Sequence, residues 1–294
     1  MSTRIAFIGL GIMGAPMAAN LVKAGFDVVG YNRSPGKTER LTAAGGRAAA
    51  SIGEAVRDAD VVATMVPDSP DVRSVLTGEG GVFENAPAGT LIIDFSTIRP
   101  DVAAELAAEG AERGFRVLDA PVSGGEQGAI EGVLSVMAGG AADDFAAAAP
   151  VLGAVGTTVV HVGPAGSGQT VKAANQLMVA GIIELVAEAI VFLEAYGVDT
   201  EAALRVLGGG LAGSTVLQRK GAAMLARDFT PGFRVALHDK DLGIVTAAAR
   251  EAGVVIPLGA LAAQLVSSLK ARGDGGLDHS ALLKLVGQLS GRQE

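Results

Sequence analysis

Short runs of β-branched and other apolar residues alternate with helix-forming segments through the first half of the chain. This pattern is typical of a parallel sheet whose strands are joined by crossover helices. It predicts strands at Arg4–Ile8, Val28–Tyr31, Val61–Met65, Leu91–Asp94, Arg116–Leu118, Leu134–Met137 and Thr158–His161. The sequence therefore predicts a Rossmann-type α/β domain over residues 1–163.

The pattern changes beyond Gly166, where strand-like runs stop and long Ala-, Leu- and Glu-rich stretches are broken by glycine and proline. Such stretches predict helices, so we expect residues 164–294 to form an all-α domain. The segment from about Gly168 to Tyr196 is apolar on most of its circumference and is longer than a typical surface helix. It predicts a long, buried central helix that joins the two domains.

Composition and charge narrow the function classes. The 31 acidic and 23 basic residues give a net charge of −8, which argues against a nucleic-acid partner. Cysteine is absent, which excludes disulfides and thiolate chemistry. The three histidines are too scattered along the chain for the spacing of a metal site, so we expect no metal.

The N-terminal sequence MSTRIAFIGL has an apolar stretch broken by glycine and no cleavage-like site, which argues against a signal peptide. No apolar run reaches membrane-spanning length without a charge or an amide. These features predict a soluble, cytoplasmic protein with no membrane partner.

A glycine motif directly follows the first predicted strand. GLGIMG has the spacing G-x-G-x-x-G, and a helix-forming run after it ends at Gly25. Glycine permits a tight turn, close approach of the backbone to a pyrophosphate and packing of helix on strand, while the helix N-terminus offers N–H groups to phosphates. In this order of strand, turn and helix, the motif predicts a dinucleotide site formed by Gly9, Leu10, Gly11, Ile12, Met13 and Gly14.

The end of the second predicted strand, YNRSPGK, bears on the choice of cofactor. An Asp or Glu at this point would bind a free ribose 2′-hydroxyl and repel a 2′-phosphate. Here Asn32, Arg33 and Ser34 present donors instead, with Lys37 nearby. The sequence therefore favours NADP(H), with NAD(H) still possible. Arg33 could also be a solvated loop residue, or could stack on adenine.

Two later strand ends are expected to complete the cofactor site, because ligands of open α/β sheets bind outside the carboxyl ends of the strands. Met65 ends the third predicted strand and Val66 and Pro67 follow it, while Ser96 and Thr97 follow the fourth. Either segment could equally be ordinary loop.

The segment DAPVSGG follows another strand and offers donors for an anion. The Ser123 hydroxyl and the N–H groups of Gly124 and Gly125 could hold a small carboxylate. A simple Gly-Gly hairpin turn is the alternative.

Lys172 is the one charged residue between Val162 and Ile183. On a helix it shares a face with Asn175 and Gln176, at i, i+3 and i+4. A purely structural lysine on a buried helix would need a carboxylate partner, and none lies one turn away in the sequence. We therefore expect Lys172 to be functional and not structural. Because the predicted helix begins where the nucleotide domain ends, we expect its N-terminal face to border the reactive ring of the cofactor.

A second charged cluster, HDKDL, lies at residues 238–242 in an otherwise apolar region. Lys240 and Asp241 could form a solvated helix start, or could reach the nucleotide from the second domain. The sequence leaves both interpretations open.

These motifs together resemble a known family, the β-hydroxyacid dehydrogenases related to 3-hydroxyisobutyrate dehydrogenase and 6-phosphogluconate dehydrogenase. GLGIMGAPMAANL, DAPVSGG, GSGQTVKAANQ and KDL occur in the family's order and span essentially the whole chain. The resemblance implies that Lys172 is the general acid/base. It also implies that the substrate carboxylate is held by Ser123, Gly124 and Gly125, that Asn175 and Gln176 orient the substrate, and that Thr97 and Lys240 contact the nicotinamide end.

Within this family, GGLAGSTVL, FTPGFRVALHDKDL and LDHSAL are most similar to the members that reduce tartronate semialdehyde (2-hydroxy-3-oxopropanoate) to glycerate. Gln176 stands where 3-hydroxyisobutyrate dehydrogenases often have a second asparagine. The resemblance implies a small carboxylate-bearing aldehyde or 3-hydroxy acid as substrate. A dehydrogenase for 3-hydroxyisobutyrate, or a non-catalytic NADP(H)-binding module, are the alternatives. By analogy we expect a homodimer or homotetramer.

Overall fold

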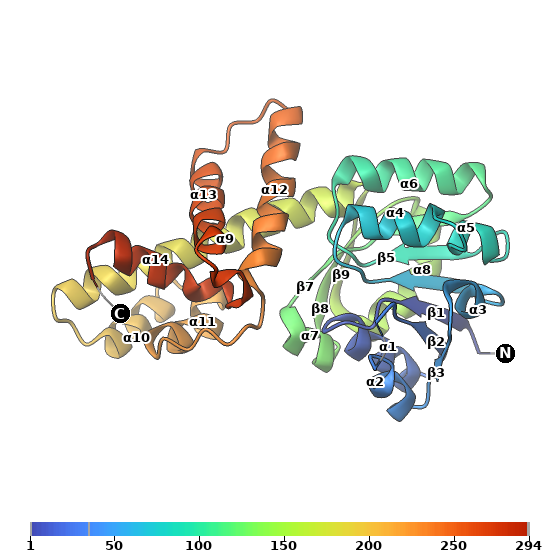
Figure 1. Cartoon of the computed structure of the whole chain (residues 1–294), viewed down its shortest axis with the longest axis horizontal. Helices are drawn as coiled ribbons and strands as arrows, with labels where there is room; N and C mark the ends of the chain where they lie inside the picture. Colours follow the sequence, from blue (N-terminus) through green and yellow to red (C-terminus); the bar gives the residue numbers. More distant parts are fainter. Residues whose placement is uncertain (1, 35, 293–294) are drawn as a thin grey trace. The chain divides into compact units, whose positions relative to one another are not determined.

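The computed structural model describes residues 2–34 and 36–292. Contacts divide the protein into two compact units, one up to Lys172 and one from Ala173 onward. Helix α9 (Ser167–Ala195) begins in the first unit and continues through the second. Figure 1 shows the sheet of the first unit and the helices of the second.

Within the described residues the first unit has one sheet of nine strands, in the order β3-β2-β1-β4-β5-β6-β8-β7 with β9 beside β8. The strands are β1 (Arg4–Ile8), β2 (Asp27–Tyr31), β3 (Arg47–Ala48), β4 (Val61–Thr64), β5 (Leu91–Asp94), β6 (Arg116–Asp119), β7 (Val122–Ser123), β8 (Leu134–Gly139) and β9 (Gly156–Gly163). The helices are α1 (Gly14–Lys23), α2 (Glu39–Ala43), α3 (Ile52–Val56), α4 (Ser69–Thr77), α5 (Val82–Asn85), α6 (Pro100–Glu112), α7 (Gly125–Glu131) and α8 (Ala142–Val155).

All seven predicted strands are present, with ends that differ by at most two residues. The structure adds β3 and β7, which have two residues each and are too short to give a β-branched run. The sequence pattern predicts a parallel sheet, but the observed sheet is not parallel throughout. β8 runs antiparallel to β6 and β7, because the chain turns back through β7 and α7 instead of making a full crossover.

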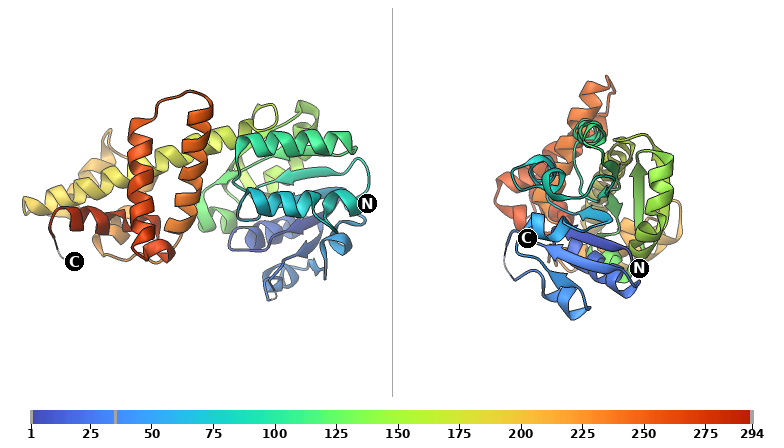
Figure 2. Two further views of the ribbon diagram at one scale, coloured as in Figure 1. Left: turned by 45° about the horizontal axis from the view of Figure 1, so that its top comes forward. Right: turned by 90° about the vertical axis from the view of Figure 1, so that its right-hand side faces the viewer.

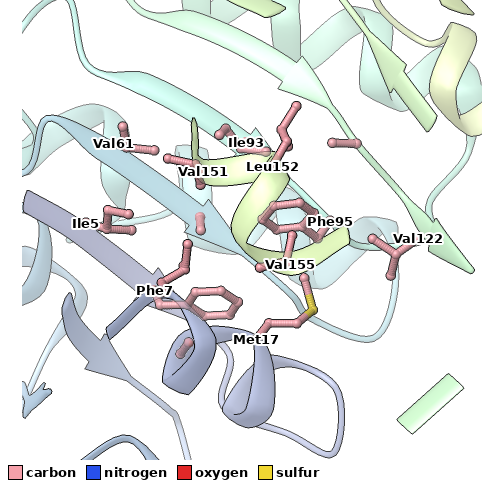
Figure 3. Packing of buried hydrophobic residues seen from close by; sticks show 14 of the residues in the cluster. Ile5, Phe7, Met17, Val61, Ile93, Phe95, Val122, Val151, Leu152 and Val155 are labelled. Carbon is pink, nitrogen blue, oxygen red and sulfur yellow. The ribbon is translucent and has the colours of Figure 1, made fainter. Parts of the chain in front are cut away.

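The core of the first unit holds the carboxyl ends of β1, β4 and β5, which is the edge where open α/β sheets bind ligands. The rings of Phe7 in β1 and Phe95, just after β5, are stacked with their centroids 6.5 Å apart. Figure 3 shows both rings with Met17 of α1 nearby. Ile8 pairs with Thr64, and Thr64 pairs with Asp94. The loops after β1, β4 and β5 therefore start level with one another at the carboxyl edge of the sheet.

The second unit is helical, as predicted. It contains the rest of α9, α10 (Thr200–Gly209), α11 (Thr215–Leu225), α12 (Val235–Glu251), α13 (Pro257–Ala271), two short 3₁₀ helices (Asp274–Gly276 and His279–Ala281) and α14 (Leu282–Leu289). Figure 2 shows α12 and α13 as an antiparallel pair. Ile183 and Ile190 of α9 are buried in a core with Leu242 of α12 and Val266 of α13.

Helix α9 is close to the predicted segment in extent. By length and hydropathy alone it could cross a membrane. However, 44% of its most apolar stretch is buried inside the protein. Ala180, Ile183, Ala187 and Ile190 all lie in the core of the second unit. One face of α9 is therefore buried in this core, whereas Met178, Leu185 and Phe192 are each more than 60% exposed, so the prediction of a buried helix is right for one face only.

Candidate active site

The glycine turn between β1 and α1 has the close packing that its motif predicts. Gly9 has a φ of 99°, and a Cβ there would lie 2.3 Å from the carbonyl oxygen of Met65. A Cβ on Gly14 would lie 1.9 Å from the carbonyl oxygen of Gly9. A Cβ on Gly11, in contrast, would meet no described atom within 4 Å. The first and third glycines are thus needed for packing, and the second faces open space.

The loop after β2 is tied to this turn. The Leu10 N–H donates to Oδ1 of Asn32 over 2.8 Å, and Nδ2 of Asn32 donates to the Ser34 carbonyl over 2.9 Å. Asn32 therefore shapes the turn with its side chain. Arg33 is 84% exposed in its side chain and lies 3.5 Å from Asp71. Ser34 and Lys37 are also exposed, so these three residues present accessible donors in the loop.

The loops after β4 and β5 are joined by Ser96, which is fully buried. Its hydroxyl oxygen accepts from the Val66 N–H over 2.9 Å. Its own N–H donates to Oδ1 of Asp94 over 3.0 Å, and Oδ1 also accepts from the Thr64 hydroxyl over 2.7 Å. Both loops are held in fixed positions at the carboxyl edge. Met65, Val66 and Thr97 are half-buried there, and Pro67 is exposed.

The segment Ser123–Gly125 connects β7 to α7 and is not a hairpin turn. Gly124 and Gly125 have φ values of 142° and 66°, which a side chain would disfavour. A Cβ on Gly125 would meet no described atom within 4 Å. Gly125 is therefore exposed, while Ser123 and Gly124 are half-buried, and a Cβ on Gly124 would lie 2.9 Å from Cδ2 of Leu134.

Lys172 lies next to this segment. Its side chain is buried, with 6% exposure, and Nζ donates to the carbonyl of Val122 over 2.7 Å. Since Val122 immediately precedes Ser123, the structure brings the predicted acid/base and the predicted carboxylate cradle together.

Asp119, at the end of β6, caps the first turn of α9, although it precedes that turn by about 50 residues in the chain. Its carboxylate accepts from the N–H groups of Gly166 over 2.7 Å and Gln169 over 2.9 Å. Burial raises the pKa of Asp119 to about 6, against the opposing effect of these two N–H groups, and the Asp94 carboxyl adds to the rise. Asp119 thus holds the start of the helix that carries Lys172.

The sequence analysis missed the roles of Asp119 and of Gln169. Gln169 is buried, with 1% exposure. Its Oε1 accepts from the Ile98 N–H over 3.0 Å, and its Nε2 donates to the Ser96 carbonyl over 2.8 Å. These partners lie 71 and 73 residues away in the chain, so no local spacing could reveal them.

In the second unit a polar network surrounds Gln176. Its Nε2 donates to Oδ2 of Asp241 over 2.5 Å, and its Oε1 accepts from Nδ2 of Asn175 over 2.7 Å. Lys240 pairs with the other carboxylate oxygen of Asp241 at 2.9 Å. Asp241 is 3% exposed and lies inside α12. The interpretation of HDKDL as a solvated helix start is therefore wrong.

Two histidines that are far apart in the sequence meet beneath this network. Nδ1 of His238 lies 3.0 Å from Nδ1 of His279, and Nε2 of His238 lies 3.3 Å from the Gln176 carbonyl. Burial, and then the neighbouring His238, hold the pKa of His279 well below its usual range. His279 is therefore neutral at physiological pH. Nothing in the spacing of the two residues indicated this contact.

Two family models match consecutive parts of the chain. Residues 4–163 match the NAD binding domain of 6-phosphogluconate dehydrogenase. Residues 166–286 match the NAD-binding model of NADP-dependent 3-hydroxyisobutyrate dehydrogenase.

Individual relatives match nearly the full length. The chain is 40% identical to 2-hydroxy-3-oxopropionate reductase of Escherichia coli K12, covering 96% of this chain and 97% of that protein. It is 36% identical to the NAD-dependent L-serine dehydrogenase of Pseudomonas aeruginosa, covering 98% and 99%. A solved structure of 3-hydroxyisobutyrate dehydrogenase from Mycobacterium tuberculosis with L-serine has a TM-score of 0.88 and 37% identity, covering 97% and 99%.

Proposed function

Because the chain belongs to the NAD(P)-dependent β-hydroxyacid dehydrogenase family, we propose that it reduces tartronate semialdehyde to glycerate with NADPH. The observation that carries this proposal is the position of Lys172, a buried ammonium bonded to the residue before Ser123. The 40% identity to the Escherichia coli reductase supports this substrate.

The residues of the glycine turn suit a bound dinucleotide. Gly11 faces open space, and Met13, the residue before α1, makes no side-chain capping hydrogen bond. The Ala15 N–H donates to the Gly11 carbonyl over 3.0 Å, so the N–H groups before Ala15 are the ones that we assign to a pyrophosphate. We assign residues 9–14, Asn32, Met65, Val66, Pro67, Thr97 and Lys240 to the cofactor site, in line with the family resemblance. The exposed donors of Arg33 and Ser34 support a preference for a 2′-phosphate over a free ribose.

The proposed chemistry needs one acid/base and one anion site. NADPH, when bound, supplies a hydride to the carbonyl carbon of the aldehyde. Negative charge then develops on the carbonyl oxygen, and the Lys172 ammonium neutralises it by transferring a proton from Nζ. The Ser123 hydroxyl and the N–H groups of Gly124 and Gly125 hold the substrate carboxylate, and Asn175 and Gln176 orient the substrate. Residues 1–163 would serve as the cofactor domain and residues 164–294 as the substrate domain.

A second candidate is the oxidation of a small β-hydroxy acid such as L-serine or 3-hydroxyisobutyrate. It is favoured by the relatives whose names carry those activities. A non-catalytic nucleotide-binding module is disfavoured, since such a module has no use for a lysine buried beside the Ser123 segment.

One assay panel tests the proposal. Oxidation of NADPH and NADH is followed with tartronate, methylmalonate and succinate semialdehydes, and reduction of NADP⁺ and NAD⁺ with L-serine and 3-hydroxyisobutyrate. We expect the highest kcat/KM for tartronate semialdehyde with NADPH. A higher kcat/KM for L-serine or 3-hydroxyisobutyrate would establish the second candidate instead, and no turnover with any acid would favour the binding module.

We further propose a homodimer or homotetramer that buries one face of α9. Met178, Leu185 and Phe192 are each more than 60% exposed and recur every seven residues, and Tyr196 extends the stripe. Such an apolar face on a helix is typical of a helix–helix interface. Leu185→Lys with Phe192→Lys should reduce the mass measured by light scattering, and Leu211→Lys, at an exposed leucine outside α9, should not. An unchanged mass in the double variant would contradict the proposal.

A further inference from the structure

We propose that Gln169 is a positioning residue that fixes Thr97 relative to Lys172. The inference rests on the proposed function, in which Thr97 contacts the nicotinamide end of the cofactor and Lys172 donates the proton. Gln169 has no contact with substrate in this scheme. It acts through the backbone of the loop after β5, which it binds on both sides of Thr97.

The two hydrogen bonds have a specific polarity. The Ile98 N–H needs an acceptor and the Ser96 carbonyl needs a donor, and both residues are buried, with exposures of 1% and 0%. The Gln169 carboxamide supplies Oε1 to the first over 3.0 Å and Nε2 to the second over 2.8 Å. One side chain therefore clamps both neighbours of Thr97, so that the conformation of Thr97 is fixed from each end.

The clamp is rigid because the start of α9 is itself fixed. Asp119 accepts from the N–H of Gln169 over 2.9 Å and from that of Gly166 over 2.7 Å. A Cβ on Gly168 would lie 2.3 Å from the Met137 carbonyl oxygen, so the helix start lies directly against β8. The backbone of Gln169 therefore has little room to move.

Lys172 follows Gln169 by three residues, which is about one helical turn. Its Nζ is held by the Val122 carbonyl at 2.7 Å. A single turn of α9 thus holds the proposed proton donor and the loop that carries the proposed nicotinamide contact. A displacement of about 1 Å between reacting groups can reduce the rate of a positioned reaction by about 100-fold. Loss of the clamp should therefore affect the chemical step more than binding.

Two substitutions and one control test this role. Gln169→Leu keeps the side-chain size and removes both hydrogen bonds. Gln169→Glu retains both hydrogen bonds when the new side chain is protonated, since a carboxylic acid can accept from the Ile98 N–H and donate to the Ser96 carbonyl. When it is ionised, the carboxylate has no proton to donate, and the hydrogen bond to the Ser96 carbonyl is lost. The control is Thr90→Val, just before the opposite end of β5, where the buried Thr90 hydroxyl donates to the carbonyls of Ala59 and Pro87.

We expect Gln169→Leu to lower the single-turnover rate of hydride transfer by at least 10-fold, with a much smaller change in NADPH affinity, using the acid that the wild type reduces or oxidises best. Thr90→Val should lower the melting temperature to a similar extent and leave that rate nearly unchanged. The Gln169→Glu rate, relative to wild type in the same buffer, should rise as the pH falls. Hydrogen exchange of the segment 95–99 should be faster in Gln169→Leu, and bound NADPH should protect it less than in the wild type.

A wild-type rate in Gln169→Leu, or an equal loss of rate in Thr90→Val, would overturn the positioning role. So would a Gln169→Glu ratio that does not vary with pH. If the wild type turns over none of the acids, the proposed function fails and the exchange measurement decides the clamp: equal NADPH protection of 95–99 in both proteins would overturn it, and reduced protection in the variant would support it.

Discussion

The ammonium of Lys172 donates a 2.7 Å hydrogen bond to the carbonyl of Val122, which precedes Ser123 in β7. The two residues lie 50 positions apart in the chain. This bond places a proton-bearing group beside a hydroxyl and two adjacent glycine N–H groups. The proposed reduction of a carboxylate-bearing aldehyde would use such a proton donor beside an anion site.

Lys172→Ala should leave NADPH affinity nearly intact and lower kcat by about 100-fold or more, the usual contribution of a positioned acid/base. Lys172→Arg should not restore the rate, because a guanidinium keeps its proton at the working pH. NADPH titration, melting temperature and single-turnover hydride transfer on both variants provide the measurement. If Lys172 is only structural, the alanine variant will melt earlier and turn over at the parent rate per folded molecule.

Arg33→Asp should shift cofactor preference toward NADH. An aspartate here would repel a 2′-phosphate and could accept from a free ribose hydroxyl. The measurement is kcat/KM for NADPH and NADH in the wild type and the variant. Arg57→Asp, an equal charge change at an exposed residue just after α3, is the control and should leave the ratio unchanged. A wild type that already prefers NADH would contradict the assignment of Arg33 to the 2′-phosphate.

Substrates should need a carboxylate. Glycolaldehyde keeps the aldehyde and the neighbouring hydroxyl of tartronate semialdehyde but leaves the donors of Ser123, Gly124 and Gly125 without an anion. The cost should be several kcal/mol of transition-state binding, or about 1000-fold in kcat/KM, since a site built for a polar group discriminates strongly against its absence. Similar kcat/KM values for the two aldehydes would remove these residues from the proposed role.

Glu184 should make the protein less stable as the pH rises. It is 9% exposed on α9. Burial, with a smaller contribution from Glu188, raises its pKa from 4.5 to about 7. The folded state therefore binds this proton more tightly than the unfolded state, and the stability that it contributes below pH 4.5 is lost as the pH rises through about 7.

Glu184→Gln should therefore raise stability at pH 8 by about 1–3 kcal/mol and change it little at pH 5, as seen in urea unfolding midpoints. Glu188→Gln is the control, because it removes only the smaller cause of the raised Glu184 pKa, the charge of Glu188. It should raise stability at pH 8 by less than Glu184→Gln does. Equal midpoints for Glu184→Gln and the wild type at pH 8 would show that this carboxyl is not destabilising.

The parts of the fold that could be predicted are those that depend on residues close together in the sequence. β1, β5 and the turn at Gly9 follow from a run of apolar residues or a fixed glycine spacing, and α9 follows from its uninterrupted apolar length. The reversal of β8 did not follow, because its direction depends on how the chain returns from β6 and not on its own residues.

The candidate site, too, could be predicted only where the signal lies within a short segment of sequence. Lys172 was visible as a lone charge in an apolar run. Its partner Val122 and the roles of Gln169 and Asp119 were not, because a cap or clamp made by a residue about 50 to 70 positions away leaves no spacing to detect. Likewise, His238 and His279 read as scattered until folding placed them 3.0 Å apart.

The close approach of Gly139 and Gly168 limits where this enzyme can be varied. A Cβ on Gly139 would lie 2.8 Å from the Gly168 N and 2.5 Å from Oδ1 of Asp119, and one on Gly168 would meet the Met137 carbonyl oxygen. The Gly168 N and the Met137 carbonyl are backbone atoms, and the Asp119 carboxylate is held by the N–H groups of Gly166 and Gln169, so none of these neighbours can easily move away. In a mutant library selected for new substrates, both codons should return glycine alone. Gly209, where a Cβ meets no described atom within 4 Å, should accept many residues, so diversity belongs there and not at the start of α9.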